Sequence, residues 1–102
     1  MRFDCTRAGG VTEWLKVAAY AAAHGVVMAP HHDAQIHGRL VAAVPNGYML
    51  EVFPNPLGDP LWEELFAGRP KVTQGVLRLQ DSPGFGFGIN PEGMRKYSTQ
   101  VC

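Results

Sequence analysis

The sequence lacks any concentration of positive charge, which limits the partners it can have. Its 102 residues hold nine lysines and arginines against nine aspartates and glutamates, so the formal net charge is zero. Nucleic-acid and anionic-membrane binders carry basic stripes or runs, and none is present here. We therefore expect neither nucleic acid nor a membrane surface as a partner.

Cysteine and long apolar runs are also scarce. Cys5 and Cys102 lie at opposite ends of the chain, without a disulfide or metal-site spacing, so we expect a reducing compartment. The longest apolar stretch, residues 17–23, is too short to span a bilayer. Nothing resembles a signal peptide, and the sequence therefore predicts a cytoplasmic protein.

What the sequence does contain is an alternation of short apolar runs and segments of helical spacing. Strands are predicted at residues 1–6, 26–30 and 48–53, each followed by a helical segment. Such alternation favours an α/β fold with parallel pairing and right-handed crossovers. No GxGxxG motif or P-loop supports a nucleotide-binding sheet. We predict βα units in residues 1–70 and an extended tail or hairpin in residues 71–102.

The first helix and the run that follows it can be described more closely. Thr12 is predicted as the N-cap of the helix, and Gly25 as the residue just beyond its end. The run at 26–30 is predicted to be a strand buried on both faces. The helix is predicted to bury the apolar residues Trp14, Leu15, Ala18, Ala19, Ala22 and Ala23.

Ionisable residues stand at or near the ends of the three predicted strands. Asp4, His31 and Glu51 would meet at one rim if the strands are parallel neighbours. Asp4 would then hydrogen-bond His31 and fix its tautomer, which makes a general base or acid near neutral pH. Glu51 would donate a hydrogen bond to a developing oxyanion if burial keeps it protonated. His32 and Asp33, which follow directly, are predicted to bind substrate.

Less specific interpretations of the same residues remain open. Asp4 also fits a loop cap, His31 a hydrogen-bonded loop histidine, and Glu51 a solvated edge residue. A metal cluster of His31, His32, Asp33 and His37 is disfavoured, because adjacent histidines rarely face one ion and no cysteine joins them. We predict no metal site, and His37 is predicted to be a helix-face residue near a pocket.

Four stretches of the chain carry a family resemblance: residues 4–14, 22–32, 50–51 and 81–86. In this order they resemble the mandelate racemase/muconate lactonising group of the enolase superfamily, and its acid-sugar dehydratases most of all. The resemblance implies a partial (β/α) TIM-barrel segment. The three predicted strands would be the sixth, seventh and eighth of the barrel.

The resemblance also implies roles for the candidate residues. Asp4 and His31 match the family's Asp–His dyad, in which the histidine moves a proton on one face of the substrate carbon. Glu51 matches the acid that hydrogen-bonds the substrate carboxylate as it becomes an enediolate. The implied reaction is magnesium-assisted removal of the proton next to a carboxylate, with a small carboxylate or acid sugar as substrate.

The sequence departs from the family's pattern in what it does not contain. The family's magnesium-binding carboxylates, its base lysine and its capping domain all match positions before Met1. We therefore expect no cofactor in this chain and no activity from it alone. Open strand edges predict a homo-oligomer, or pairing with the missing barrel segments. The alternative is a non-catalytic oligomeric module, structural or binding, that reuses the barrel fragment.

Overall fold

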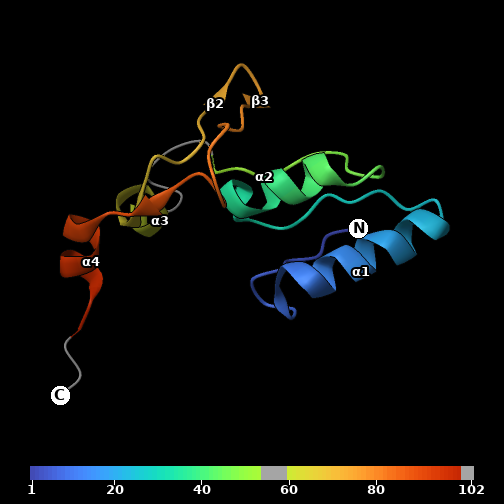
Figure 1. Cartoon of the computed structure of the whole chain (residues 1–102), viewed down its shortest axis with the longest axis horizontal. Helices are drawn as coiled ribbons and strands as arrows, with labels where there is room; N and C mark the ends of the chain where they lie inside the picture. Colours follow the sequence, from blue (N-terminus) through green and yellow to red (C-terminus); the bar gives the residue numbers. More distant parts are fainter. Residues whose placement is uncertain (54–59, 100–102) are drawn as a thin grey trace. The chain divides into compact units, whose positions relative to one another are not determined.

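A computed structural model of the chain describes residues 1–53 and 60–99 (Figure 1). The chain divides into two compact units, Met1–Val52 and Phe53–Cys102, which are described separately below. Helices and small sheets make up the fold, so the predicted α/β class is confirmed. The predicted division after residue 70 stays a prediction. Among the described residues, no helix combines the length and apolarity that crossing a membrane requires.

Helix α1, Gly10–Ala23, begins two residues before the predicted cap Thr12. Gly9 takes the N-cap position with a positive φ of 87°, and no side chain caps the helix. At the other end, Gly25 has φ 67° and its N–H donates to the carbonyl of Ala22. The N–H of the following residue donates back to the carbonyl of Ala21, which completes a Schellman motif. The prediction for Gly25 is therefore confirmed.

The buried face of α1 is narrower than predicted. Trp14, Ala18 and Ala21 are its buried residues, at spacings of four and three. Leu15 is 40% exposed, and Ala19 and Ala23 are also exposed, so the predictions for these three residues were wrong. Small alanines on the buried side allow close packing, and the indole of Trp14 supplies most of the buried volume.

The three predicted strands do not form a continuous sheet. Residues 1–53 contain one parallel bridge, between Met28 and Gly47. The N–H of Met28 donates to Asn46, and the N–H of Tyr48 donates to Met28, at 2.8 and 3.0 Å. On the other side, the N–H of Ala29 donates to Met1 at 2.9 Å. The run 26–30 therefore lies between the other two segments, as predicted, but pairing ends at Pro30, which has no N–H.

Burial of this central run also differs from the prediction. Met28 is fully buried, whereas Val26 and Val27 are 38% and 47% exposed. Pro30 is fully buried as well, so the run is covered at Met28 and Pro30 and not at its first two residues. The core of this unit is formed by Cys5, Trp14, Ala18, Ala21, Met28 and Leu40.

Helix α2, Ala34–Ala43, confirms the second predicted helix. Its apolar residues at helical spacing face inward: Leu40 is buried, and Ile36, Val41 and Val44 lie against the core. After α2 the chain turns tightly at Gly47. A Cβ on Gly47 would lie 2.1 Å from the carbonyl oxygen of Val41, so only glycine fits there. This close approach brings the third segment alongside Met28.

The second unit is built from short elements. Helix α3, Pro60–Leu65, leads into β1, Phe66–Ala67, which pairs antiparallel with β4, Gly88–Ile89. Strands β2, Val72–Thr73, and β3, Val76–Leu77, form a hairpin, which the tail prediction allowed. Helix α4, Pro91–Tyr97, is capped by Asn90, whose side chain accepts from the N–H of Glu92. Gly93 of α4 packs tightly against the carbonyl of Glu64.

Candidate functional site

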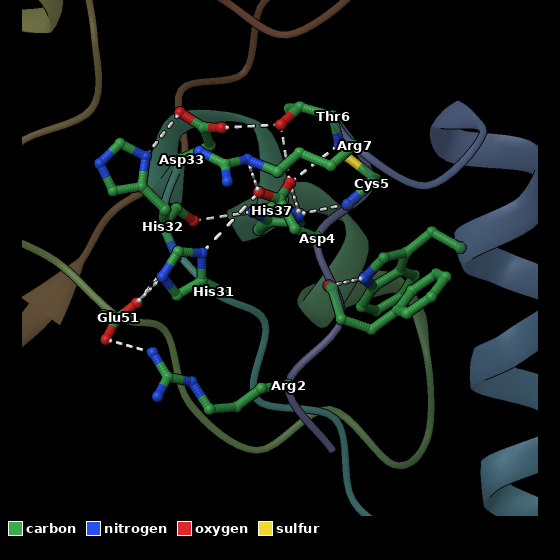
Figure 2. Close-up of polar contacts among 12 residues, drawn as sticks. Arg2, Asp4, Cys5, Thr6, Arg7, His31, His32, Asp33, His37 and Glu51 are labelled. Atoms are coloured by element: carbon green, nitrogen blue, oxygen red, sulfur yellow. Dashed lines mark hydrogen bonds and ion pairs between the residues drawn. The ribbon is translucent and has the colours of Figure 1, made fainter.

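The imidazole of His31 lies between the carboxylates of Asp4 and Glu51 (Figure 2). Its Nδ1 is 3.9 Å from Oδ2 of Asp4, and its Nε2 is 3.7 Å from Oε2 of Glu51. Both distances exceed a hydrogen bond, so the predicted Asp4–His31 hydrogen bond is not formed. The three predicted catalytic residues are nevertheless together, although the chain separates them widely. The His31 side chain is 43% exposed, so its ring can be reached from solvent.

Local structure explains why these side chains converge. Asp4 is anchored by its neighbour Phe3, whose carbonyl accepts from the indole Nε1 of Trp14 at 2.9 Å. His31 follows Pro30 at the point where the central run ends. Glu51 is drawn to the same place because one of its oxygens accepts from the backbone N–H of His32 at 3.0 Å.

Asp4 is held as a charged acceptor. Its Oδ1 accepts from the N–H and the hydroxyl of Thr6, at 2.9 and 2.8 Å. Its Oδ2 lies 3.5 Å from Nε of Arg7. Burial by itself would raise the pKa of the Asp4 carboxyl, but the Thr6 hydrogen bonds and nearby positive charge outweigh it. The pKa therefore falls below its ordinary value of 3.8.

Glu51 differs from the expectation that burial keeps it protonated. Its carboxylate is 39% exposed and accepts from Nη2 of Arg2 at 2.7 Å. The backbone N–H of His32, together with the Arg2 guanidinium, holds the pKa of Glu51 below its usual value. In this structure Glu51 is therefore an ionised acceptor and has no proton to donate.

His32 and Asp33 form a constrained corner before α2. Both have positive φ, 59° and 45°, a region that costs free energy for residues other than glycine. Asp33 is 7% exposed, and its Oδ1 accepts from Nε2 of Gln35 at 3.4 Å. Its Oδ2 lies 3.2 Å from the hydroxyl of Thr6, whose single proton it shares with Asp4. Nδ1 of His32 lies 3.2 Å from Asp33. The substrate-binding role of His32 and Asp33 stays a prediction. The contacts of Asp33 chiefly hold in place the backbone corner before α2.

The structure adds His37, which the sequence interpretation placed on a helix face. His37 is fully buried. Its Nδ1 lies 2.8 Å from the carbonyl of His32, and its Nε2 accepts from the N–H of Cys5 at 3.0 Å. One ring therefore connects the segment bearing Asp4 with the corner after His31. Its position three residues before Leu40, on the apolar stripe of α2, was the signal that burial should be expected.

Cys5 is a buried thiol beside this ring. Burial, and then the negative charges of Asp4 and Asp33, raise the pKa of the Cys5 thiol above its ordinary value. An activated nucleophile requires a lowered thiol pKa, so Cys5 is not one. Although no cysteine adjoins the histidines in the sequence, the backbone N–H of Cys5 contacts His37 in the folded chain.

Metal-binding potential among the described residues is limited to one group of three: Asp4, Cys5 and His37. Magnesium prefers several oxygen ligands in octahedral geometry. A set with one thiol and one imidazole does not provide them, and the carboxylates of Asp33 and Glu51 are already engaged by Gln35 and Arg2. The described residues therefore do not fit magnesium.

A shallow pocket of ≈ 300 Å³ adjoins the site. Arg2 and Glu51 supply its polar groups. Its apolar wall consists of Ala29, Pro30, Met49 and Leu50. The pocket thus offers a guanidinium, a carboxylate and an apolar surface to a small polar ligand.

Comparison with known proteins gives a consistent result. The family model described as enolase C-terminal domain-like matches residues 1–93. The chain is 33% identical to the L-rhamnonate dehydratase of Saccharopolyspora erythraea over 93 residues, which are 87% of this chain and 24% of that protein. It therefore spans about a quarter of the length of the curated relatives it matches.

Solved structures similar to this chain include two enzymes with bound magnesium. A mandelate racemase/muconate lactonizing enzyme from a marine actinobacterium, in complex with magnesium, has a TM-score of 0.88 and 36% identity. The match covers 97% of this chain and 28% of that one. The L-talarate dehydratase of Polaromonas sp. JS666, complexed with Mg and L-glucarate, has a TM-score of 0.78 and 30% identity, covering 92% and 25%.

Proposed function

Because the chain belongs to the enolase C-terminal domain-like family, we propose that it supplies the proton-transfer groups of an acid-sugar dehydratase active site. The observation that carries this proposal is the imidazole of His31 between two carboxylates, with its ring partly open to solvent. The substrate class is taken from relatives named as dehydratases of L-rhamnonate and L-talarate. Both names denote sugar acids.

His31 is the general acid and base of this proposal. The Asp4 carboxylate faces Nδ1, which favours the tautomer with its proton there and leaves Nε2 to exchange a proton with substrate. In a dehydration, a base takes the proton next to the carboxylate, and the neighbouring hydroxyl receives a proton and leaves as water. Nε2 of His31 is the base that accepts the first proton. His31 is assigned the proton delivered to that departing hydroxyl.

Glu51 must exchange its present hydrogen-bond partners before it can hydrogen-bond an enediolate, which is the role that the family resemblance implies. As long as it accepts from Arg2 and His32, it presents only acceptor oxygens. To hydrogen-bond an enediolate, Glu51 must take up a proton, and release of the Arg2 guanidinium would permit this. We therefore assign Arg2 and Glu51 to the substrate side of the site, consistent with their place in the pocket wall.

The fold proposal is that the segments around Met1, Met28 and Tyr48 are neighbouring parallel strands of a partial (β/α) barrel. The backbone hydrogen bonds on both sides of Met28 and Ala29 support this arrangement. Magnesium supplies charge neutralisation for an enediolate when it is bound. Since the described residues do not fit that ion, we propose that the 102-residue chain is inactive alone.

A chimera tests the function. Residues 1–93 would replace the matching segment of the Polaromonas L-talarate dehydratase, and turnover of L-talarate and L-glucarate would be measured with magnesium. We expect turnover from the chimera and none from the chimera with His31→Ala. His24→Ala, an exposed histidine at the end of α1, is the matched control and should retain activity. A folded but inactive chimera, or activity that survives His31→Ala, contradicts the proposal.

The isolated chain provides the second half of the test. The pure 102-residue protein, assayed with the same sugar acids and magnesium, should show no turnover. Turnover by the pure chain would show that the proposed need for further residues is wrong.

A second candidate function is a non-catalytic module that assembles with itself. The observation favouring it is the exposure of large apolar side chains along the paired segments of the first unit, namely Val26, Val27, Tyr48, Met49 and Val52. Sedimentation at micromolar concentration should then show an oligomer that His31→Ala leaves unchanged. A stable monomer would exclude this alternative.

A further inference from the structure

We propose that the pocket beside Arg2 and Glu51 binds one sugar acid without magnesium. The Arg2 guanidinium binds a carboxylate of this ligand, and Glu51 accepts a hydrogen bond from a neighbouring hydroxyl. The inference deepens the proposed function and rests on its assignment of these two residues to the substrate side of the site. It adds that Arg2 recognises the acid group, and that the isolated chain binds a ligand that it does not turn over.

Hydrogen-bonding capacity remains on both residues. Nη2 of Arg2 donates to Oε1 of Glu51 at 2.7 Å, and within the part of the chain that the structure describes this is the one hydrogen bond of the guanidinium. A guanidinium has five N–H donors, so four remain for a ligand. Among the same residues, each oxygen of Glu51 accepts one hydrogen bond, from Arg2 and from the N–H of His32. Each oxygen therefore keeps a second lone pair for a ligand hydroxyl.

The backbone on both sides of Arg2 is held in place. The carbonyl of Met1 accepts from the N–H of Ala29 at 2.9 Å, and the carbonyl of Phe3 accepts from the indole of Trp14 at the same distance. The Arg2 side chain itself is 63% exposed, so a ligand can reach it from solvent. A side chain with an anchored backbone loses less conformational freedom when a ligand binds, and this favours affinity.

The pocket has the size and the lining for one small polar molecule. Its volume of ≈ 300 Å³ lies at the lower end of the range of about 300–1,000 Å³ that is typical of ligand pockets. Arg2 and Glu51 are its charged residues, and the rest of the lining is apolar, namely Ala29, Pro30, Met49 and Leu50. Such a lining suits a carbon chain that carries an acid group and hydroxyls, since the C–H groups of the chain can lie against the apolar wall.

The two charges select the class of ligand. Figure 2 shows the Arg2 guanidinium directed toward the Glu51 carboxylate, so a simple carboxylate that approaches Arg2 is also repelled by Glu51. A neutral polyol can donate to Glu51 but offers only uncharged oxygens to Arg2. A hydroxy acid satisfies both residues, and hydrogen bonds with an ionised partner are roughly twice as strong as neutral ones. The pocket therefore favours a hydroxy acid over either simpler ligand.

A bound carboxylate would also act on Glu51. It competes with Glu51 for the guanidinium, so the Arg2–Glu51 hydrogen bond weakens when the ligand binds. Glu51 would keep the hydrogen bond from the N–H of His32, the larger cause of its lowered pKa, and would lose part of the effect of Arg2. Binding therefore begins the exchange of partners that the proposed function requires of Glu51.

Calorimetric titration in magnesium-free buffer with a chelator tests the site on the full-length chain. L-Glucarate is the probe. Adipate has the same carbon skeleton and both carboxylates but no hydroxyls, and glucitol has the hydroxyls but no carboxylate. We expect saturable binding of one L-glucarate per chain. Adipate and glucitol should each bind at least about 10-fold more weakly, because each engages only one of the two residues.

Variants then identify the residue that recognises the acid. Arg2→Met should weaken L-glucarate binding by at least about 10-fold, because it removes the charge-assisted hydrogen bonds. Lys16→Met is the matched control and should bind as the parent does. Lys16 is likewise an exposed cation paired with a glutamate, its Nζ lying 2.7 Å from Oε1 of Glu13. Exposed ion pairs contribute little stability, and far-ultraviolet circular dichroism would report whether each variant is folded.

The result on the parent chain decides the proposal first. Absence of saturable L-glucarate binding by the folded parent overturns it, whether or not the variants fold. Equal binding of adipate or glucitol, or binding that Arg2→Met leaves unchanged, overturns it as well. A chimera without turnover, alongside a parent chain that binds L-glucarate, would contradict the proposed catalysis and leave this site in place. An active chimera alongside a parent chain that does not bind would do the reverse.

Discussion

The backbone N–H of Cys5 donates a hydrogen bond to Nε2 of His37, 3.0 Å away and 32 residues further along the chain. The other nitrogen of the ring contacts the carbonyl of His32. A fully buried side chain thus joins the end of the first segment to the corner that follows His31. The relative position of Asp4 and His31 depends on this one residue of α2.

Replacement of His37 by leucine should therefore destabilise the first unit. The N–H of Cys5 and the carbonyl of His32 would lose their partner in a buried place, at a cost of about 1–3 kcal/mol each. We expect His37→Leu to lower the free energy of unfolding by roughly 2–5 kcal/mol in urea titrations. His37→Gln, whose amide can both donate and accept, should lose less. If the leucine variant were as stable as the parent, His37 would not be holding the first segment to the corner after His31.

Asn46 connects the turn after α2 with α1. Its side-chain Nδ2 donates to the carbonyls of Ala18 and Val26, at 3.0 and 2.9 Å. Asn46→Asp keeps the shape but replaces the donor with a negative oxygen facing two carbonyls. We expect a loss of about 2–4 kcal/mol in the free energy of unfolding at neutral pH. Gln74→Glu, the same chemical change at an exposed hairpin position, should stay within about 0.5 kcal/mol of the parent.

The alanines of α1 provide a test of packing. Ala18 is fully buried, whereas its neighbour Ala19 is exposed. Ala18→Leu adds volume where none is available and should cost about 1–3 kcal/mol in thermal or urea unfolding. Ala19→Leu should change stability by less than about 0.5 kcal/mol. If both substitutions have the same effect, the orientation of α1 described above is wrong.

The charge of Glu51 gives a prediction about pH. The N–H of His32 and then Arg2 lower the pKa of Glu51 from its ordinary value of 4.5. Because the pKa is lower in the folded chain than in the unfolded one, Glu51 contributes stability above pH 4.5, and this is lost as pH falls through the lowered value. Arg2→Met should move the pKa of Glu51 part of the way back toward 4.5, since the His32 hydrogen bond remains. Carboxyl titration by NMR measures this, and no upward movement would contradict the pairing.

The positions of the helices were largely predictable because their signals are local. The stripe at Ile36, Leu40, Val41 and Val44 recurs at helical spacing, and Gly25 ends α1 through its own positive φ. Asn90 precedes a proline and caps α4 by bonding two residues ahead. Each signal lies within a few residues of its effect, so sequence alone can reveal it.

Which side chains of a predicted strand are exposed was less predictable than the positions of the helices. The hydrophobic run at 26–30 has the composition of a strand covered on both sides, yet Val26 and Val27 are exposed. Composition records which side chains can be buried. It does not record which neighbours are present to bury them, and in residues 1–53 the core takes only Met28 from this run.

The sequence by itself predicted that Asp4, His31 and Glu51 would lie near one another, because each stands at or near the end of a segment of the same pattern. Only the tertiary structure decided their chemical states. The N–H of His32, and then Arg2 from 49 residues away, lower the pKa of Glu51. His37 accepts from the N–H of Cys5, which lies 32 residues away. Pairing between such distant residues depends on the direction and distance of side chains in the folded chain, and neither spacing nor composition encodes those quantities.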